Sequence, residues 1–459
     1  RSDAPRDVAL RGGDELLAQD SRGRRLVMFG GDEVSAIVMD LGSSATKSGY
    51  AGEDCPKFVI PSSVGITAGE ESAAQEGPSK RTFHVGTNAL SVPRAGMTVD
   101  GALRDGIVHD WDAAEALMEH SLKNCLGCDP TDHPLLMAEP SFNPTANRLK
   151  LTEIAFEKFN VPALFLSKNA VLAAFAAGRG TAMVLDVGGG VSCAAAVHDG
   201  YVLNKPLKKT TLGGDLLTEL ALKAVSLHDP EPAIQPVYCV KRNLADQPVA
   251  HSSYHKYTQL QVLREVKECV CRCNMYPPTA EYPLNTDSWE HELPDRSTLD
   301  TAWERFHLPE LFFQPTLLKS PVPGAAPPPW LASSSAPPPG AAELANMVPE
   351  MVGLPEMVAE SIRACDTDTR RELWGSVVVC GGGSLLPGLT DRLHWRLNQL
   401  VPQMSMKVKL IAPTTPQERR FAVWIGGSIL ASLGSFQQLW MSKAEYEEQG
   451  AQGILRKCP

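Results

Sequence analysis

The sequence has no uninterrupted apolar run as long as the roughly 20 residues that a membrane-spanning helix requires, so no membrane partner is expected. It has no excess of basic residues either, because 43 Lys and Arg side chains stand against 53 Asp and Glu, which gives a net charge of −10. Strong direct binding to DNA depends on clustered Lys and Arg and is therefore not expected. The acidic balance favours basic protein partners instead, and histones are one candidate class.

Pairs of metal-binding cysteines are also lacking. The 11 cysteines are an odd number spread over 459 residues, a distribution that fits a reducing compartment. Cys125 and Cys128 have the CxxC spacing of half a zinc site, but no second pair follows at the distance of a zinc ribbon or finger. Core or surface thiols are therefore the favoured interpretation, with a zinc half-site as the alternative.

Apolar strands alternate with helical segments along the chain. Buried-strand runs occupy residues 34–40, 181–186 and 376–380, and residues 251–273 carry apolar side chains at helical spacing. A second helical stretch with one short break covers residues 426–450. This alternation predicts an α/β architecture.

Two segments depart from this pattern. Residues 1–33 are polar, carry charges of both signs, and are predicted to form a disordered N-terminal tail. Residues 316–345 are rich in Pro, Ala, Gly and Ser and cannot bury enough apolar surface to fold alone. They are predicted to form a flexible surface insertion.

The stretches AIVMDLGSSATKSGY (36–50) and AMVLDVGGGVSC (182–193) share one pattern. In each, an apolar strand ends in an aspartate, Asp40 or Asp186, and a small-residue turn leads into a returning strand. Each aspartate can orient a water on a divalent cation, since Mg²⁺ prefers carboxylates and waters as ligands. The pattern predicts two related hairpins that hold one ligand.

The turns themselves indicate that this ligand carries phosphate. Gly42 and Gly188 take equivalent places in the two turns, where successive backbone N–H groups form a nest for anionic oxygens. Lys47 extends from the first hairpin as a point charge suited to a phosphate. A third glycine cluster, CGGGSLLPG at 380–388, adds to the prediction of a nucleotide gripped between two α/β lobes. Three unrelated tight turns are the alternative.

Long collinear segments of the chain resemble the actin family, and the likeness covers nearly all of residues 34–459 apart from the insertion. The segments that carry it are residues 50–65, 133–165, 170–190 and 418–450. Within the family, three features are similar to the nuclear actin-related protein 4 group rather than to conventional actin, namely residues 29–43, residues 84–97 and a loop lengthened at 414–416.

The resemblance implies the actin-like ATPase fold, in which two related RNase H-like lobes surround a nucleotide cleft. The first lobe is expected to comprise residues 34–176 and 417–459, with a small exposed subdomain at about 61–100. The second lobe is expected to comprise residues 177–416, including the insertion.

The resemblance also implies ATP with Mg²⁺ as a structural ligand. The nucleotide positions that carry over are Asp40, Gly42, Ser43 and Lys47, then Asp186 and Gly188, then Gly213 and Asp215, then Lys267 and Glu268 beside the adenosine, and Gly381 and Gly382 on the adenine side. Asp40 and Asp186 are expected to hold the Mg²⁺ through water. At 385 and 386, leucines stand where the family more often has Met and Tyr.

Three departures concentrate where hydrolysis would occur. Actin orients its attacking water with a glutamine, an aspartate and a histidine, and the corresponding positions here are Asn169, Gly189 and Cys193. Asn169 is one methylene shorter than glutamine, Gly189 has no side chain, and the Cys193 thiol is a weak hydrogen-bond donor. Phosphoryl transfer depends on positioning and electrostatics, so negligible hydrolysis is expected.

The resemblance therefore implies a nuclear, non-catalytic subunit of chromatin-remodelling complexes of the SWI/SNF type, histone-variant exchange complexes and histone acetyltransferase complexes. The expected partners are actin, an amphipathic helix of a remodelling ATPase and other subunits of these complexes. The helix would enter a groove near residues 160–170 and 424–440. The alternatives are a filament-forming cytoskeletal ATPase like conventional actin and a sugar or acid kinase, which shares the two-hairpin architecture.

Overall fold

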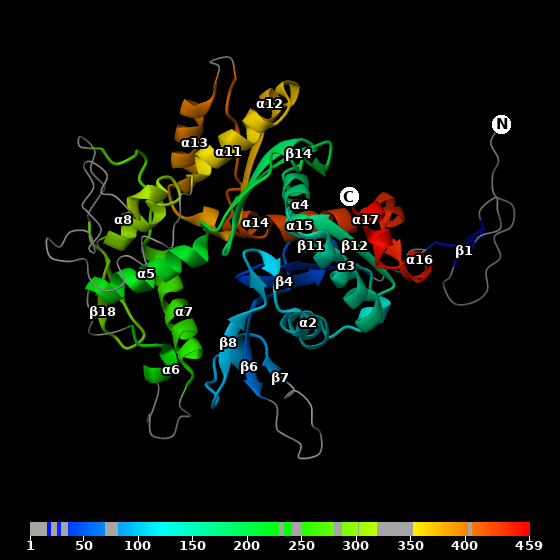
Figure 1. Cartoon of the computed structure of the whole chain (residues 1–459), viewed down its shortest axis with the longest axis horizontal. Coiled ribbons are helices and arrows are strands. Elements are labelled where there is room, and N and C mark those ends of the chain that lie inside the picture. The colour runs from blue at the N-terminus through cyan, green and yellow to red at the C-terminus, as the bar shows by residue number, and fades with distance from the viewer. Residues whose placement is uncertain are drawn as a thin grey trace.

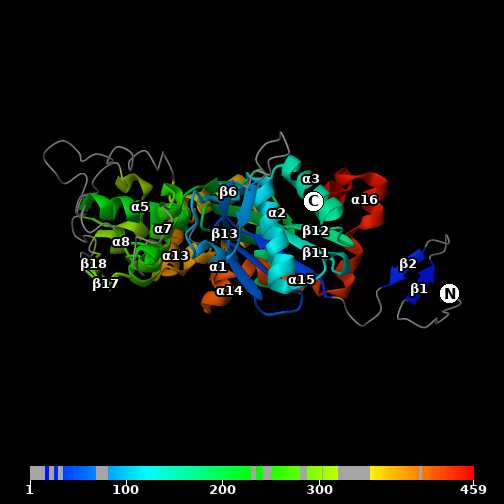
Figure 2. The same cartoon turned by 90° about the horizontal axis from the view of Figure 1, so that it is seen from below.

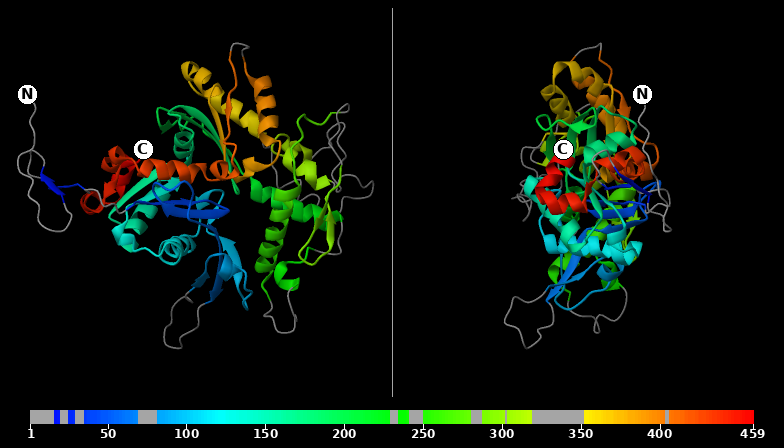
Figure 3. Two further views of the ribbon diagram at one scale, coloured as in Figure 1. Left: turned by 180° about the vertical axis from the view of Figure 1, so that it is seen from behind. Right: turned by 90° about the vertical axis from the view of Figure 1, so that its right-hand side faces the viewer.

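Two mixed sheets with helices packed around them form the body of the protein, which is broad in Figure 1 and thin when seen edge-on in Figures 2 and 3. The structure is a computed structural model. It describes residues 16–19, 25–28, 35–68, 81–228, 234–240, 250–279, 287–301, 303–318, 352–402 and 406–459. The predicted α/β class is confirmed.

The first sheet has the strand order β21-β12-β11-β3-β4-β5. Its strands are β3 (Ile37–Leu41), β4 (Ala45–Tyr50), β5 (Phe58–Pro61), β11 (Leu135–Glu139), β12 (Ala163–Lys168) and β21 (Met441–Ser442). Every residue of β3 and β11 is buried, which is why these strands read as continuous apolar runs. The first-lobe helices are α2 (Trp111–Glu119), α3 (Thr145–Glu153), α4 (Asn169–Ala176) and α15 (Ala422–Ala431).

The second sheet has the order β15-β14-β13-β19-β20, and β16 also pairs with β14. Its strands are β13 (Ala182–Val187), β14 (Ser192–His198), β15 (Tyr201–Val202), β16 (Lys208–Thr210), β19 (Val377–Cys380) and β20 (Leu410–Ile411). The helices of this lobe are α5 (Gly214–His228), α6 (Val237–Val240), α7 (Ser252–Val270), α8 (Trp303–Glu310), α11 (Leu354–Ala364), α12 (Thr367–Trp374) and α13 (Leu389–Leu400).

The two sheets repeat one topology. In each, an antiparallel hairpin (β3–β4 or β13–β14) is followed by two strands parallel to its first strand (β11 and β12, or β19 and β20). The register repeats as well, because Asp40 faces Lys47 in the first hairpin and Asp186 faces Cys193 in the second. The expectation of two related lobes with an actin-like fold is confirmed by this arrangement.

A small third sheet, with the order β7-β6-β8, occupies the lower end of the molecule in Figure 1. It consists of β6 (Ser63–Ala68), β7 (Arg81–His84) and β8 (Thr98–Gly101), accompanied by α1 (Thr87–Leu90). These elements lie in the stretch expected to form the exposed subdomain. Residues 69–80 lie outside the described residues.

Helices α4 and α15 lie at the centre of the molecule (Figure 1). Helix α4 contacts strands of both sheets, and α15 packs on α4 and on β3. The indole Nε1 of Trp424 donates a hydrogen bond to the carbonyl oxygen of Val38 at 3.0 Å, which fixes α15 against the first sheet. This helix pair therefore joins the two halves of the fold.

The remaining elements are short. They are β9 (Leu103–Arg104), β10 (Ile107–Val108), β17 (Glu290–Glu292), β18 (Thr298–Asp300), α14 (Pro416–Arg420), α16 (Lys443–Gln449) and α17 (Ile454–Lys457), with π-helical turns at His120–Leu126 and Ile154–Lys158 and 3-10 turns at Pro130–Asp132, Pro315–Leu318, Gly382–Leu385, Gly434–Leu439 and Ala451–Gly453. The helix expected over 251–273 ends at Val270, because the Arg272 and Cys273 amides donate to carbonyls outside it.

The two segments expected to lack structure are only partly described. Within residues 1–33, β1 (Leu16–Gln19) and β2 (Arg25–Met28) form an antiparallel hairpin. The rest of that tail lies outside the described residues. The insertion at 316–345 lies outside them from residue 319, and its first residues close a 3-10 turn in which Leu317 is buried. No described helix is long and apolar enough to cross a membrane.

Candidate functional site

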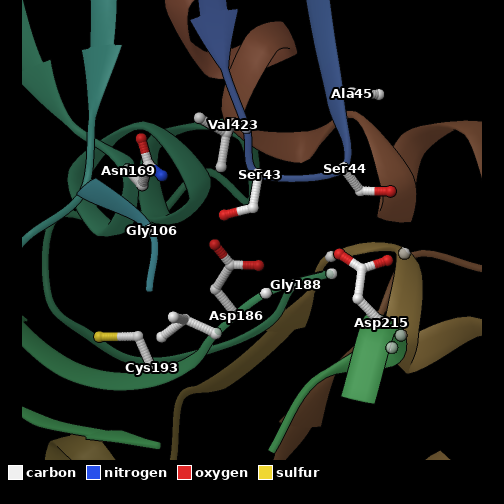
Figure 4. Close-up of a pocket in the computed structure, with 18 of the residues that line it drawn as sticks. Ser43, Ser44, Ala45, Gly106, Asn169, Asp186, Gly188, Cys193, Asp215 and Val423 are labelled. Atoms are coloured by element: carbon white, nitrogen blue, oxygen red, sulfur yellow. The ribbon is translucent and has the colours of Figure 1, made fainter. Parts of the chain in front are cut away.

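A cavity of about 420 Å³ lies between the two hairpins and is lined by residues of both sheets. Figure 4 shows Ser43 and Ser44 of the first hairpin facing Asp186, Gly188 and Asp215 across it. The residues expected at a nucleotide site that line this cavity are Asp40, Gly42, Ser43, Lys47, Asp186, Gly188, Asp215, Lys267, Glu268, Gly381 and Gly382, together with Asn169, Gly189 and Cys193. The fold thus brings together residues that are up to several hundred positions apart in the chain.

The two turns have the same internal geometry. The amide of Gly42 donates to the Ala45 carbonyl oxygen at 3.2 Å, and the amide of Gly188 donates to the Val191 carbonyl oxygen at 3.1 Å. A Cβ atom would lie 2.9 Å from the acceptor oxygen at Gly42 and 2.6 Å from it at Gly188. Only glycine fits either turn, which is the physical reason for the repeated Asp-x-Gly pattern.

The aspartates that precede the turns differ in their surroundings. The Asp40 carboxylate is buried and forms an ion pair with the Lys47 ammonium at 2.7 Å. Asp186 is half-buried beside it, and the loss of solvent together with the Asp40 charge raises the pKa of Asp186 to about 6. Two neighbouring carboxylates therefore share the single ammonium of Lys47, a condition that favours binding of a further cation beside them.

The raised pKa of Asp186 predicts a pH-dependent stability. Because the folded chain binds this proton more tightly than the unfolded chain, whose pKa is near 3.8, stability falls as the pH rises from about 4 to about 6. Asp186→Asn should remove this dependence and leave the free protein up to about 3 kcal/mol more stable above pH 6. Urea unfolding at several pH values, without nucleotide or Mg²⁺, measures the effect. The exposed Asp54→Asn serves as control, and an unchanged pH profile in the Asp186 variant would contradict the assignment.

The three positions expected to lack water-orienting groups all reach the cavity. Asn169 is the first residue of α4, and the buried Oδ1 of its side chain has no hydrogen-bond partner in the described part of the chain. Gly189 contributes only backbone. Burial and the neighbouring Asp186 carboxylate raise the pKa of Cys193 to about 12, so that its thiol stays neutral at physiological pH. None of these groups can accept a proton from a water at neutral pH.

Two of the positions expected at the nucleotide site, Lys267 and Gly213, make contacts within the second lobe. The Lys267 ammonium is committed to its own lobe, since it donates to the Gly214 carbonyl at 2.6 Å and to the Thr218 hydroxyl at 2.8 Å. Gly213 does not line the cavity, because it lies against the second hairpin, where a Cβ atom would be 2.2 Å from the Gly189 carbonyl oxygen. Gly213 therefore supports the hairpin from behind.

Further lining residues were not anticipated from the sequence. Arg264 on α7 forms an ion pair with Asp215 at 2.9 Å, and its place one turn before Lys267 and Glu268 is a spacing signal that could have revealed it. Ser44 follows Ser43 in the first turn, and Phe142 has no local signal at all. Leu385 and Leu386 also line the cavity.

The third glycine cluster closes the cavity beside Asp186. Gly381 has a φ of +87°, and a Cβ atom there would lie 2.4 Å from both the Asp186 Oδ1 and the Val187 carbonyl oxygen. A Cβ atom at Gly382, by contrast, would meet nothing within 4 Å, so that this residue borders open space. The cluster thus combines one tightly packed glycine with one that leaves room for a ligand.

ATP with Mg²⁺ fits this set of groups. The acidic groups at the cavity (Asp40, Asp186, Asp215 and Glu268) are matched in number by basic ones (Lys47, Arg264, Lys267 and Arg420), and both turns present backbone N–H groups. In the described part of the chain, no group of three or more His, Cys, Asp or Glu side chains is arranged to hold a metal. A Mg²⁺ ion that keeps most of its waters is compatible with that finding, since it needs few protein ligands.

Comparison with known proteins agrees with this geometry. The protein-family model described as "Actin" matches residues 31–459. The chain is 42% identical over 461 residues to the actin-related protein 4 of Arabidopsis thaliana, covering 94% of this chain and 100% of the relative. It is 37% identical to that of Yarrowia lipolytica, covering 94% and 97%, and 35% identical to that of Schizosaccharomyces pombe, covering 92% and 96%. With two repeated hairpins around one cavity and a match along almost its entire length, this chain belongs to the actin family.

Proposed function

We propose that this protein is a non-catalytic nuclear subunit of chromatin-remodelling and histone acetyltransferase complexes, which binds ATP with Mg²⁺ as a structural ligand. In this role it pairs with actin on a helix of a remodelling ATPase. Other subunits of these complexes and histones are further partners. The names of its relatives, which are actin-related proteins 4, support the assignment to this branch of the family.

One observation carries the proposal. The two turns expected to bind phosphate keep their geometry, whereas the positions expected to orient water lack a side chain that could do so. Gly42 and Gly188 keep the turn geometry, whereas Gly189 lacks a side chain and the Cys193 thiol stays neutral. ATP with Mg²⁺ would supply negative charge that backbone amides of both hairpins bind. Asp40, Asp186 and Lys47 would orient the ion and the phosphates, and no residue would activate water.

An exposed apolar surface supports the partner part of the proposal. Ile429, Leu433 and Leu439 are 41%, 40% and 51% exposed. Ile429 lies on α15, Leu433 on the extended link after it, and Leu439 at the end of the 3-10 turn that follows. Exposed apolar side chains gathered on one short stretch suit an amphipathic helix, which would bury them on binding. They fall inside the stretch 424–440, where the sequence predicts such a contact.

The absence of a water-orienting group predicts ATP binding without turnover. With the protein in excess over radiolabelled ATP and Mg²⁺ present, phosphate release over several hours should stay at the buffer-only rate. ATP at about 100 times its Kd should raise the free energy of unfolding by about 2.7 kcal/mol. Conventional actin run in parallel is the positive control. Phosphate release at the rate of actin would favour the alternative, a filament-forming ATPase.

The exposed apolar surface gives a second test. Leu433→Glu should weaken binding to an actin-containing remodelling complex at least about tenfold, because it places a charge in a buried helix contact. Affinity purification from nuclear extract, with quantification of actin and remodeller subunits, measures the effect. Val92→Glu, at a side chain 50% exposed on the small subdomain, is the matched control. Equal recovery of these subunits by both variants would refute this docking surface.

A further inference from the structure

We infer that the two lobes close directly on each other through a contact between the Ser43–Ser44 turn and Gly189–Gly190, and that this contact requires glycine at position 189. The inference goes beyond the proposed function. In the proposed function, Gly189 matters because it lacks a catalytic carboxylate. Here it matters also because it forms a contact between the lobes. The cleft width is set by the chain itself, before any nucleotide binds.

The distances between the two hairpins carry the argument. A Cβ atom at Gly189 would lie 2.6 Å from the Ser44 Cβ, and one at Gly190 would lie 2.9 Å from both the Cβ and the Oγ of Ser43. A Cβ atom is one bond from the backbone, so Ser44 cannot yield without moving its whole turn. At these two glycines the hairpins are thus in contact, with no room there for a Cβ atom.

The second hairpin cannot retreat from this contact. The amides of Gly214 and Asp215, at the start of α5, donate to the carbonyl oxygens of Gly188 and Gly189 at 3.0 and 2.9 Å. The Asp215 carboxylate, held by its ion pair with Arg264, fills the remaining side, where a Cβ atom at 189 would be 2.7 Å from its Oδ2. Helix α5 therefore supports the hairpin from behind, and Asp215 encloses position 189.

Two other contacts cross the cleft away from the hairpins. The Lys209 ammonium lies 4.3 Å from the centroid of the Phe142 ring, which joins β16 of the second lobe to the first. The amide of Val99, on β8, donates to the hydroxyl of Ser253, on α7, at 3.0 Å. A wedge between the hairpins would therefore have to break contacts at the mouth of the cleft as well.

The same close contact prevents position 189 from regaining a carboxylate by itself. A carboxylate placed at 189 would meet Ser44 and would lie beside the acidic groups of Asp186 and Asp215. Restoring the acid alone would push the lobes apart. A single reversion at this position is therefore insufficient to rebuild a hydrolytic site.

The test uses the full chain freed of nucleotide and Mg²⁺, with hydrogen exchange resolved to single amides. Gly189→Ala should speed exchange of the Val99 amide about tenfold, because opening the hairpins separates β8 from α7. The double variant Ser44→Gly with Gly189→Ala should restore most of the protection, since it removes the Ser44 Cβ, and the other colliding atom, the Asp215 Oδ2, ends a side chain that can shift within its own lobe. Gly180→Ala is the matched control, because a Cβ atom there meets nothing within 4 Å.

Wild-type exchange at Val99 in Gly189→Ala would overturn the inference, and so would failure of Ser44→Gly to rescue it. Ser44→Val provides a second wedge from the opposite hairpin and should reproduce the opening even where Gly189→Ala folds poorly. Because no nucleotide or partner is present, the result is independent of the phosphate-release and complex-recovery experiments.

Discussion

Gly426→Ala should be one of the most destabilising single substitutions in this protein, with a loss of about 3 kcal/mol or more in the free energy of unfolding. A Cβ atom at this position of α15 would lie 1.9 Å from the carbonyl oxygen of Leu172, 2.6 Å from its carbonyl carbon and 3.0 Å from its Cα. All three atoms belong to the backbone of α4, so no side-chain rotation can make room. Urea unfolding at neutral pH measures the loss.

Neighbouring glycines supply graded controls. At Gly427 a Cβ atom would meet side-chain atoms, the nearest being the Val38 Cγ1 at 2.8 Å, so Gly427→Ala should cost less than Gly426→Ala because side chains can rearrange. At Gly434 nothing lies within 4 Å, and the alanine variant should match wild type to within about 0.5 kcal/mol. Equal stabilities across this series would show that α4 and α15 do not approach each other closely.

Arg392→Met should have an effect of comparable size. The Arg392 guanidinium and the Glu310 carboxylate form an ion pair at 3.0 Å, with only 2% and 0% of these side chains exposed. Arg392 also packs over the rings of Phe313 and Trp395, at 4.9 and 5.0 Å from the ring centroids. Removing one partner leaves a buried carboxylate without its counter-charge, for an expected loss of about 3–5 kcal/mol.

The pH dependence of this loss follows from Glu310. Burial raises the pKa of Glu310 to about 7, although the Arg392 charge opposes the rise. Below pH 5 the carboxyl is protonated in the folded wild type and in the variant alike, so the loss should be smallest there and largest above pH 7. Glu310→Leu combined with Arg392→Met should recover most of the stability, because an apolar pair of similar volume replaces the ions. A loss that does not vary with pH would contradict this account.

The sequence predicts those parts of the fold that depend on local pattern. The apolar runs ending at Asp40 and Asp186 become the central strands of two sheets, since both faces of those strands are covered. The shared Asp-x-Gly pattern predicts equivalent turns, because a tight turn with an inward amide excludes a side chain at the glycine. Resemblance to a family then supplies the rest of the cavity, including Glu268 and Gly382, which no local pattern identifies.

The sequence does not predict contacts that depend on how distant segments meet. The Glu310–Arg392 pair joins residues 82 positions apart, and neither position has a signal that its charge is buried. Lys267 matches a nucleotide contact by position, yet its ammonium binds Gly214 and Thr218, because α5 packs closely against α7. The approach of Ser44 to Gly189 is likewise a property of the assembled lobes.

Helix α15 combines a buried inner face that joins the lobes with an exposed apolar side chain on its outer side. Its inner face, with Trp424 and Gly426, holds the joint between the lobes, and Ile429 is exposed on its outer side. A partner seated on that outer side would therefore rest on the helix that joins the two halves of the fold. If such a partner binds the closed cleft better than the open one, a ligand that favours the closed cleft tightens partner binding by the same factor by which the partner tightens ligand binding. Binding of a ligand in the cavity and assembly into a complex would then both depend on one equilibrium, that between the open and the closed cleft.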